Sequence, residues 1–394
     1  MTNSSIWDRS INLTAWFLFV LLSSLIVYNN IFYRFLKPFF SVNASLLFHR
    51  FIIYSFFFLF AFRLFLNRDQ VIKFRFAYLL SFVIFFISIT SFSFSLVSNT
   101  LFTLLVLLNM LISSERSNSF VKVNQVIYLI SVVTVLSVAA TFFWALFDAD
   151  LSFISIDSSF RSFFIHRNAF GIAFISSALF MSQKLERKKL CALYVLTFFL
   201  VFFSTSRTAV LAYLVASSFL VHCLLKRYFV TFLNVFLCLF MMLGVSLHWN
   251  ADLLRILVSG EELPYSSKYR GYEESTSERA ILLAQSFKIL KNNSFFGTRN
   301  LQERPVLNNK RMSPHNFILL NAMTYGVPYA LLLVSLMLLV FINLNIYQKA
   351  LMSVVVSFGV LQPYLDFFHL ESALLIFVMI IFTHCVIQSS GIKE

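Results

Sequence analysis

Residues 125–147 read "QVIYLISVVTVLSVAATFFWALF" and contain no charged side chain. A helix that crosses the hydrocarbon core of a bilayer needs about 20 mostly apolar residues. Lipid offers no partner to an unpaired backbone group, so a segment of this kind spans the membrane as a helix. The stretch therefore predicts a transmembrane helix.

Similar apolar runs recur along the whole chain of 394 residues, of which 59% are hydrophobic and only 12% are charged. Soluble domains carry about 25% charged residues. We therefore predict an all-α, polytopic integral membrane protein with about 12 transmembrane helices. The predicted spans cover residues 10–29, 46–66, 76–93, 96–113, 125–147, 163–182, 189–204, 208–225, 229–248, 316–345, 348–363 and 370–389.

The charged residues between these runs predict an orientation, because Lys and Arg gather on the cytoplasmic side. Basic residues mark every second connection, namely 63–75, 114–124, 183–189, 226–227 and the turn at Lys349. Acidic residues mark the intervening connections 148–157 and 364–371, and the basic connection 30–50 is an exception. We predict that both termini are cytoplasmic. The net charge of +14 follows the span boundaries and forms no single basic face, so we expect no nucleic-acid partner.

Residues 249–315 form one long connection on the predicted outer, periplasmic face, and long ordered loops are usually functional. Inside it, 275–290 predicts a helix, because Ser275 and Glu278 have capping-box spacing. One apolar stripe on this helix is formed by Ala280, Leu283, Phe287 and Leu290. The loop divides the chain into N-terminal helices (1–150), helices with an arginine motif (151–248), the loop (249–315) and C-terminal helices (316–394).

Two arginines on the outer face are candidate phosphate ligands. Arg207 in "STSRTAVLAYL" (204–214) lies between two apolar runs, and Arg279 begins the predicted loop helix. An arginine beside a span usually faces a partner or a water-filled cavity, and its planar fork suits a phosphate. A phosphate also suits a helix N-terminus. The alternatives are a lipid-headgroup anchor for Arg207 and a solvated charge for Arg279.

Two further polar clusters lie at the same predicted face. In "PHNFILLNAMTYG" (314–326), His315 is a candidate base, since histidine takes up a proton near neutral pH, and Asn316 is a candidate ligand of a sugar hydroxyl. The alternative is an ordinary helix start. The other cluster surrounds "FIHRNAFG" (164–171) and contains Arg161, His166, Arg167 and Asn168. Together the clusters predict a cationic pocket with a base, suited to a lipid-linked pyrophosphate sugar, and we expect no metal site and no cofactor.

Three of these stretches resemble the O-antigen polymerase and ligase superfamily: "SRTAVL" (206–211), "SERAILLAQSFKILKNNSFFG" (277–297) and "PHNFILLNAMTYG". The last fits the family pattern through His315, Asn316, Leu319 and Gly326. The resemblance covers about 160–330. It implies a metal-independent, inverting GT-C-type glycosyltransferase of the bacterial inner membrane, with its active site on the periplasmic side and an undecaprenyl-diphosphate glycan as donor. By position, Arg207 and Arg279 would bind the diphosphate and His315 would activate the acceptor.

The resemblance leaves the acceptor open. A polymerase transfers the glycan to another lipid-linked repeat unit, whereas a ligase transfers it to lipid A–core. We favour the polymerase, because the 52 phenylalanines and the "HRNAFG" stretch resemble polymerases more, and a chain-length regulator is then a candidate partner. A flippase for lipid-linked oligosaccharides is a more remote alternative, and it predicts internal repeats that the sequence does not display.

Overall fold

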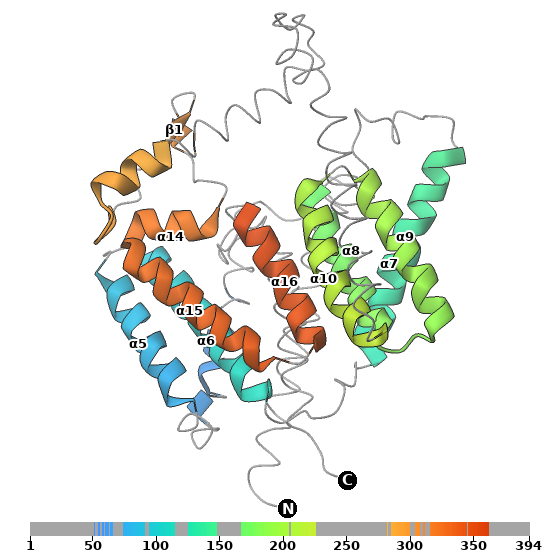
Figure 1. Cartoon of the computed structure of the whole chain (residues 1–394), viewed down its shortest axis with the longest axis horizontal. Coiled ribbons are helices and arrows are strands. Elements are labelled where there is room, and N and C mark those ends of the chain that lie inside the picture. Colours follow the sequence, from blue (N-terminus) through green and yellow to red (C-terminus); the bar gives the residue numbers. More distant parts are fainter. Residues whose placement is uncertain are drawn as a thin grey trace, which may run out of the picture.

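The computed structural model of the protein is a bundle of α-helices (Figure 1). It describes parts of 51–65 and then residues 74–90, 94–114, 125–147, 167–204, 206–225, 282, 285–299, 304–307, 310–311, 316–344 and 346–361. The predicted spans at 10–29, 229–248 and 370–389 lie outside the described residues.

The helices follow the apolar runs of the sequence and confirm the all-α prediction. They are α5 (Arg75–Ile89), α6 (Phe94–Ser114), α7 (Gln125–Phe147), α8 (Arg167–Ser182), α9 (Arg187–Phe203), α10 (Arg207–Leu225), α14 (Phe317–Tyr325), α15 (Val327–Asn343) and α16 (Ile346–Leu361). Among the residues that the structure describes, no helix combines the length and the apolar character that crossing a membrane requires. The count of twelve spans stays a prediction.

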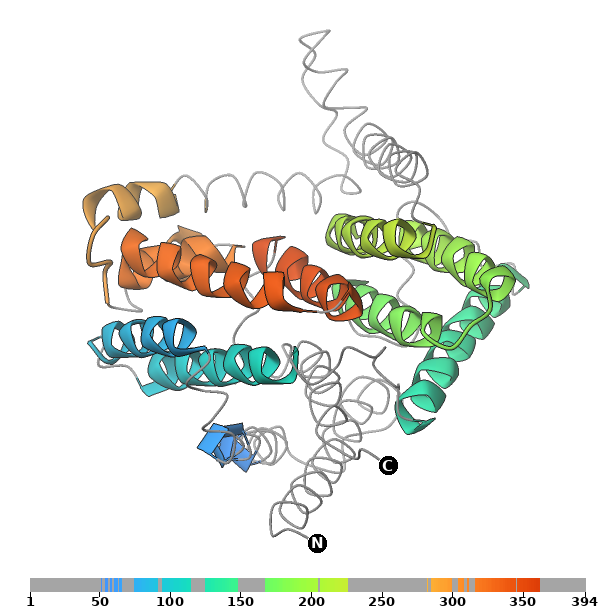
Figure 2. The same ribbon diagram turned by 60° about the horizontal axis from the view of Figure 1, so that its bottom comes forward.

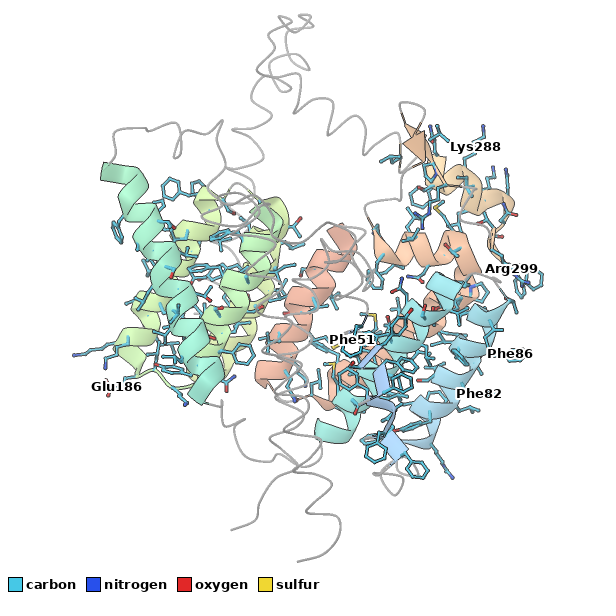
Figure 3. The ribbon with its side chains drawn as sticks, turned by 180° about the vertical axis from the view of Figure 1, so that it is seen from behind. Phe51, Phe82, Phe86, Glu186, Lys288 and Arg299 are labelled. Atoms are coloured by element: carbon cyan, nitrogen blue, oxygen red, sulfur yellow. The ribbon has the colours of Figure 1, made fainter. Side chains whose placement is uncertain are left out.

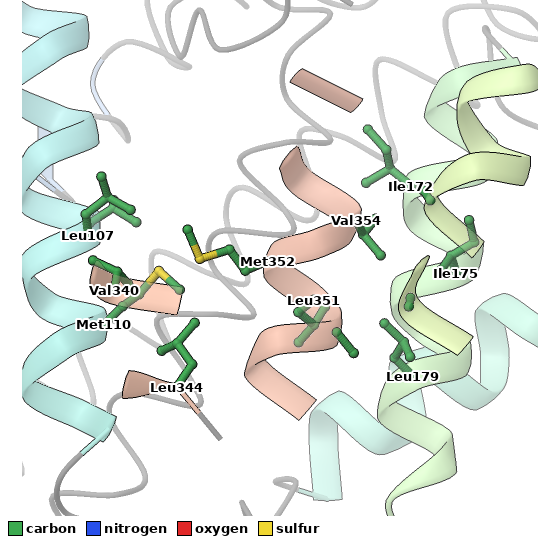
Figure 4. Close-up of a cluster of buried hydrophobic side chains, with 14 of the residues drawn as sticks. Leu107, Met110, Ile172, Ile175, Leu179, Val340, Leu344, Leu351, Met352 and Val354 are labelled. Carbon is green, nitrogen blue, oxygen red and sulfur yellow. The ribbon is translucent and has the colours of Figure 1, made fainter. Parts of the chain in front are cut away.

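Helix α16 occupies the middle of the molecule, between α5, α6, α14 and α15 on one side and α7 to α10 on the other (Figures 1 and 2). Its side chains are buried on both sides. Met352 lies toward Leu107 of α6 and Val340 of α15, whereas Leu351 and Val354 lie toward α8 (Figure 4). These buried apolar residues of α16 belong to the same hydrophobic core as those of both groups, so α16 joins the two groups.

Small side chains line the interfaces among α8, α10 and α16, which pack against one another. Ala212 and Ala216 of α10, Ser176 of α8 and Ala350 of α16 are fully or almost fully buried. Small residues let helix backbones approach closely, which is the usual way in which helices associate inside a bilayer. This packing fixes α10, and with it the first residue of α10, relative to α8.

One sequence prediction about the C-terminal half is wrong, and one feature of this half was not predicted. The apolar run 316–345 is two helices and not one, because the chain breaks at Gly326 between α14 and α15. The loop also contains a short antiparallel hairpin that the sequence did not predict, formed by β1 (Val306–Leu307) and β2 (Lys310–Arg311).

The predicted loop helix is described as helical over residues 285–292. Its buried face differs from the predicted apolar stripe: Ser286 is fully buried, whereas Phe287 is 55% exposed. The hydroxyl of Ser286 donates to the carbonyl of Leu282, which satisfies the buried polar group within the helix. We call residues 285–299 the outer segment.

Candidate functional site

The candidate residues gather at one end of the helix bundle. The turn between α8 and α9, which contains Glu186, lies at the opposite end from the outer segment, which contains Lys288 (Figure 3). Helix α8 runs toward that turn, and α9 runs back from it to the start of α10. The first residues of α8 and α10 therefore lie at the same end as the outer segment and α14 (Figure 1).

Arg207 is the first residue of α10, and Ser206 caps this helix. The Ser206 hydroxyl accepts a hydrogen bond from the backbone N–H of Ala209 at 3.2 Å. The Ser206 N–H in turn donates to the hydroxyl of Ser204 at 3.3 Å. These bonds set the start of the helix at Arg207, whose side chain lies outside the described residues. The N-terminal end of the helix supplies positive potential to an anion at this point.

Arg167 and Asn168 open α8 in the same way, and their side chains lie outside the described residues. Helices α8 and α10 pack directly and run in the same direction, so their N-termini are neighbours. The aromatic rings of Phe170 and Phe174 stack at 5.4 Å between centroids and are fully buried, which anchors the first turns of α8 in the core. Two N-terminal helix ends with arginines at one place form a potential anion site.

Asn316 is the N-cap of α14, since its side-chain oxygen accepts from the backbone N–H of Leu319 at 2.9 Å. Leu319 itself is buried, and Gly326 ends the helix. The predicted helix start at Asn316 is therefore confirmed. A role of Asn316 in substrate binding stays a prediction. Because the side-chain oxygen accepts the capping hydrogen bond, the side-chain amide nitrogen is the atom that would bind the substrate.

Gly326 forms the break between α14 and α15 with a backbone φ of 96° and ψ of 162°. This region of backbone conformation is essentially restricted to glycine. A Cβ atom at Gly326 would also overlap the carbonyl of Phe295. Gly297 is restricted in the same two ways. Its φ of 67° lies in the left-handed region, and a Cβ atom added to it would lie 2.5 Å from the carbonyl oxygen of Thr324. Both positions thus exclude a side chain by conformation and by space.

The outer segment satisfies the backbone groups that the helix break exposes. The N–H of Thr298 donates to the carbonyl of Met323 at 2.7 Å, and the N–H of Arg299 donates to the carbonyl of Thr324 at 2.9 Å. On the other side of the break, the N–H of Val327 donates to the carbonyl of Ser294 at 2.8 Å.

These bonds supply partners to the last carbonyls of α14 and to the first N–H of α15, which helices leave unpaired. We call this contact between residues 294–299 and 322–327 the glycine joint. Met323 and Thr324 are buried, and buried backbone groups need hydrogen-bond partners, which the joint supplies.

Two further contacts order the outer segment. The side-chain oxygen of Gln285 accepts from the N–H of Val306, which ties the hairpin to the segment's helix. The guanidinium of Arg299 lies over the ring of Phe296, 5.3 Å from its centroid. Figure 2 shows the outer segment in light orange beside the orange helices to which it is bonded. These contacts order the segment and its hairpin, and the glycine joint is what bonds the segment to the bundle.

The structure describes the position of only some of the residues of the predicted pocket. Arg207, Arg167 and Asn168 open helices at the shared end, and Asn316 caps α14 at that end. Outside the described residues lie Arg161, His166, Arg279 and His315. Their roles stay predictions.

The sequence reasoning missed the joint, although signals for it were present. Gly326 stands inside an apolar run and Pro328 follows it by two residues, an order that is typical of a helix that ends and a new one that begins. The pairing of Gly326 with Gly297 has no local signal, because it depends on a contact between distant parts of the chain.

Comparison with known proteins bears directly on this region. The family model described as O-antigen ligase matches residues 192–334, a range that contains Arg207, the outer segment and the joint. The match supports the O-antigen polymerase and ligase superfamily, and with it a ligase or polymerase type of function. No curated protein and no solved structure matches the chain.

Proposed function

We propose that this chain is an inner-membrane glycosyltransferase that moves an O-antigen glycan from undecaprenyl diphosphate to an acceptor hydroxyl. The observation that carries the proposal is the match at residues 192–334, which contains every residue assigned a chemical step below. The shared end of α8 and α10 supports it, since two helix N-termini with arginines suit a diphosphate.

The proposed reaction needs a base and a stabilised leaving group. His315 takes the proton of the acceptor hydroxyl, whose oxygen attacks the anomeric carbon of the donor sugar. The bond between that carbon and the diphosphate oxygen breaks, so undecaprenyl diphosphate leaves with the electron pair and the anomeric centre inverts. Arg207 and Arg279 hold the diphosphate and stabilise its growing charge. The reaction needs no metal ion in this scheme.

We favour an O-antigen polymerase, in which the acceptor belongs to a second lipid-linked repeat unit. The ligase, whose acceptor is lipid A–core, is the second candidate, and the match to a family of O-antigen ligases favours it. Both use the same donor chemistry, so they differ only in the acceptor side of the pocket.

Deletion of the gene followed by gel analysis of lipopolysaccharide separates the two candidates. A single repeat unit on the core identifies a polymerase. Bare core with lipid-linked polymer accumulating identifies a ligase. Unchanged lipopolysaccharide contradicts both.

Complementation of the deletion then tests the mechanism. We expect Arg207→Ala and His315→Ala to abolish transfer at normal membrane levels of the protein. Arg187→Ala is the matched control, because Arg187 also opens a helix but at the opposite end of the bundle, and we expect it to retain transfer. Full glycan assembly by Arg207→Ala would remove Arg207 from the mechanism.

A further inference from the structure

The glycine joint connects the two parts of the chain that carry the proposed chemistry. The outer segment follows Arg279 in the sequence, and α14 begins directly after His315 and Asn316. The joint bonds the C-terminal end of the outer segment to the C-terminal end of α14. The donor-binding side and the base-bearing side therefore share one rigid attachment.

We propose that Gly297 and Gly326 are positioning residues for glycosyl transfer, a role that rests on the function proposed above. Each glycine lets two backbones meet where a side chain has no room. This close approach brings the N–H groups of Thr298 and Arg299 within hydrogen-bond distance of α14. The glycines thus fix the outer segment on α14 without touching the substrate themselves.

A fixed outer segment matters because transfer depends on the placement of the reacting groups. A displacement of about 1 Å at a remote position can lower the rate of an enzyme about 100-fold. Helix α14 is short, running from Phe317 to Tyr325, and α15 and α16 pack against it. A shift at its glycine end is therefore passed on to its first turn, next to His315.

The joint resists opening, because its bonds are the partners of otherwise unpaired helix-end groups. In the closed joint, Met323 and Thr324 are buried residues and their carbonyls accept from the N–H groups of Thr298 and Arg299. Burial of unpaired polar groups is unfavourable, so the closed joint is the stable state. A variant that prevents these hydrogen bonds therefore weakens the attachment of the outer segment to α14.

Val327 offers a variant that breaks one bond of the joint and leaves the helix intact. It is the first residue of α15, a position at which proline is well tolerated because the helix itself does not use this N–H. Val327→Pro removes the donor to the Ser294 carbonyl. Val327→Ala is the matched control, since it shortens the side chain and keeps the N–H.

Gly297→Ala and Gly326→Ala test the glycines directly, each alone and then together. Both alanines open the same contact, so we expect the double variant to be little worse than the more damaging single one. Leu336→Ala is a control for general loss of stability, because Leu336 is a fully buried residue of α15 outside the joint.

The experiment uses the full chain in lipid nanodiscs and two measurements. Hydrogen exchange reports whether the amides of Thr298, Arg299 and Val327 are protected. Transfer rates with an undecaprenyl-diphosphate glycan give kcat and KM for donor and acceptor separately. For both alanine variants we expect loss of protection at all three amides, and for Val327→Pro, which has no amide at position 327, loss of protection at Thr298 and Arg299. In all three variants we expect kcat/KM for the donor to be lower by about 10–100-fold and the acceptor KM to be unchanged. Val327→Ala and Leu336→Ala should keep the protection and a nearly wild-type kcat/KM.

The results separate failure of this inference from failure of the proposed function. Lost protection with wild-type kcat/KM overturns the positioning role. Retained protection in all three joint variants overturns the joint itself. A wild-type chain that does not use the lipid diphosphate donor, while its joint amides are protected, overturns the proposed function and with it the positioning role.

Discussion

At the scale of single residues, the stretch 314–326 contains three residues with structural roles and one residue proposed for the chemistry. Asn316 caps α14, Leu319 is buried, and Gly326 provides the break that the outer segment fills. These roles are the ones that any short buried helix needs: an N-cap, a buried apolar side chain and a residue that ends the helix. His315 lies outside the described residues, and its role as the base stays a prediction.

Arg279→Lys should lower transfer by about tenfold or more, because a lysine ammonium lacks the planar fork that binds a phosphate through paired hydrogen bonds. The measurement is the donor KM and kcat of the purified chain. Arg299→Lys is the matched control, since the Arg299 guanidinium lies over Phe296 within the same segment and its backbone N–H is kept. Wild-type kinetics in Arg279→Lys would reduce Arg279 to a solvated charge.

At the scale of elements, α16 decides how the two groups of helices meet. It packs against α8, α10 and α14, and its Met352 lies toward α6 and α15 (Figure 4). A buried polar bond supports one of these groups: the hydroxyls of Thr100 and Tyr329 lie 3.1 Å apart and join α6 to α15. The end with the candidate residues therefore depends on packing far from it.

Leu351→Ala should lower the free energy of unfolding by about 2–5 kcal/mol, because the cavity that it leaves removes contacts to α8. Thermal unfolding in detergent measures the change. Ile342→Ala is the control, as Ile342 of α15 is 69% exposed. Equal shifts of Tm in both variants would show that α16 is not a packing centre.

At the scale of the whole molecule, the two ends of the helix bundle contain different structural features. One end has the turn at Glu186, and the other has the outer segment, the joint and the first residues of α8 and α10 (Figure 3). A membrane between these ends would place the proposed chemistry on one face only.

Cysteine labelling tests this arrangement in a background where the native cysteines are serine. We expect Lys288→Cys to react with an impermeant maleimide in intact spheroplasts, and Glu186→Cys only after permeabilisation. Glu186 is a safe position, because its contact with Lys189 is a 4.0 Å surface pair of exposed side chains, and such pairs contribute little. Labelling of both positions from one side would contradict the predicted orientation.

The sequence by itself determined the helices, because long uncharged apolar runs have few stable alternatives. Residues 125–147 are predicted and observed as a helix with the same bounds. It also determined the start of α14, since an asparagine before an apolar run is a local cap signal. Both predictions needed only neighbours within a few residues.

Only the tertiary structure decided the break at Gly326, the buried face of the outer segment and the central place of α16. Each depends on partners distant in the sequence: Gly326 lies against Phe295, and α16 packs against α8, α10 and α14. The hydrophobic pattern of an apolar run is the same whether the run forms one helix or two. The difference comes from backbone groups that are unpaired at a break unless another part of the chain supplies them with hydrogen bonds.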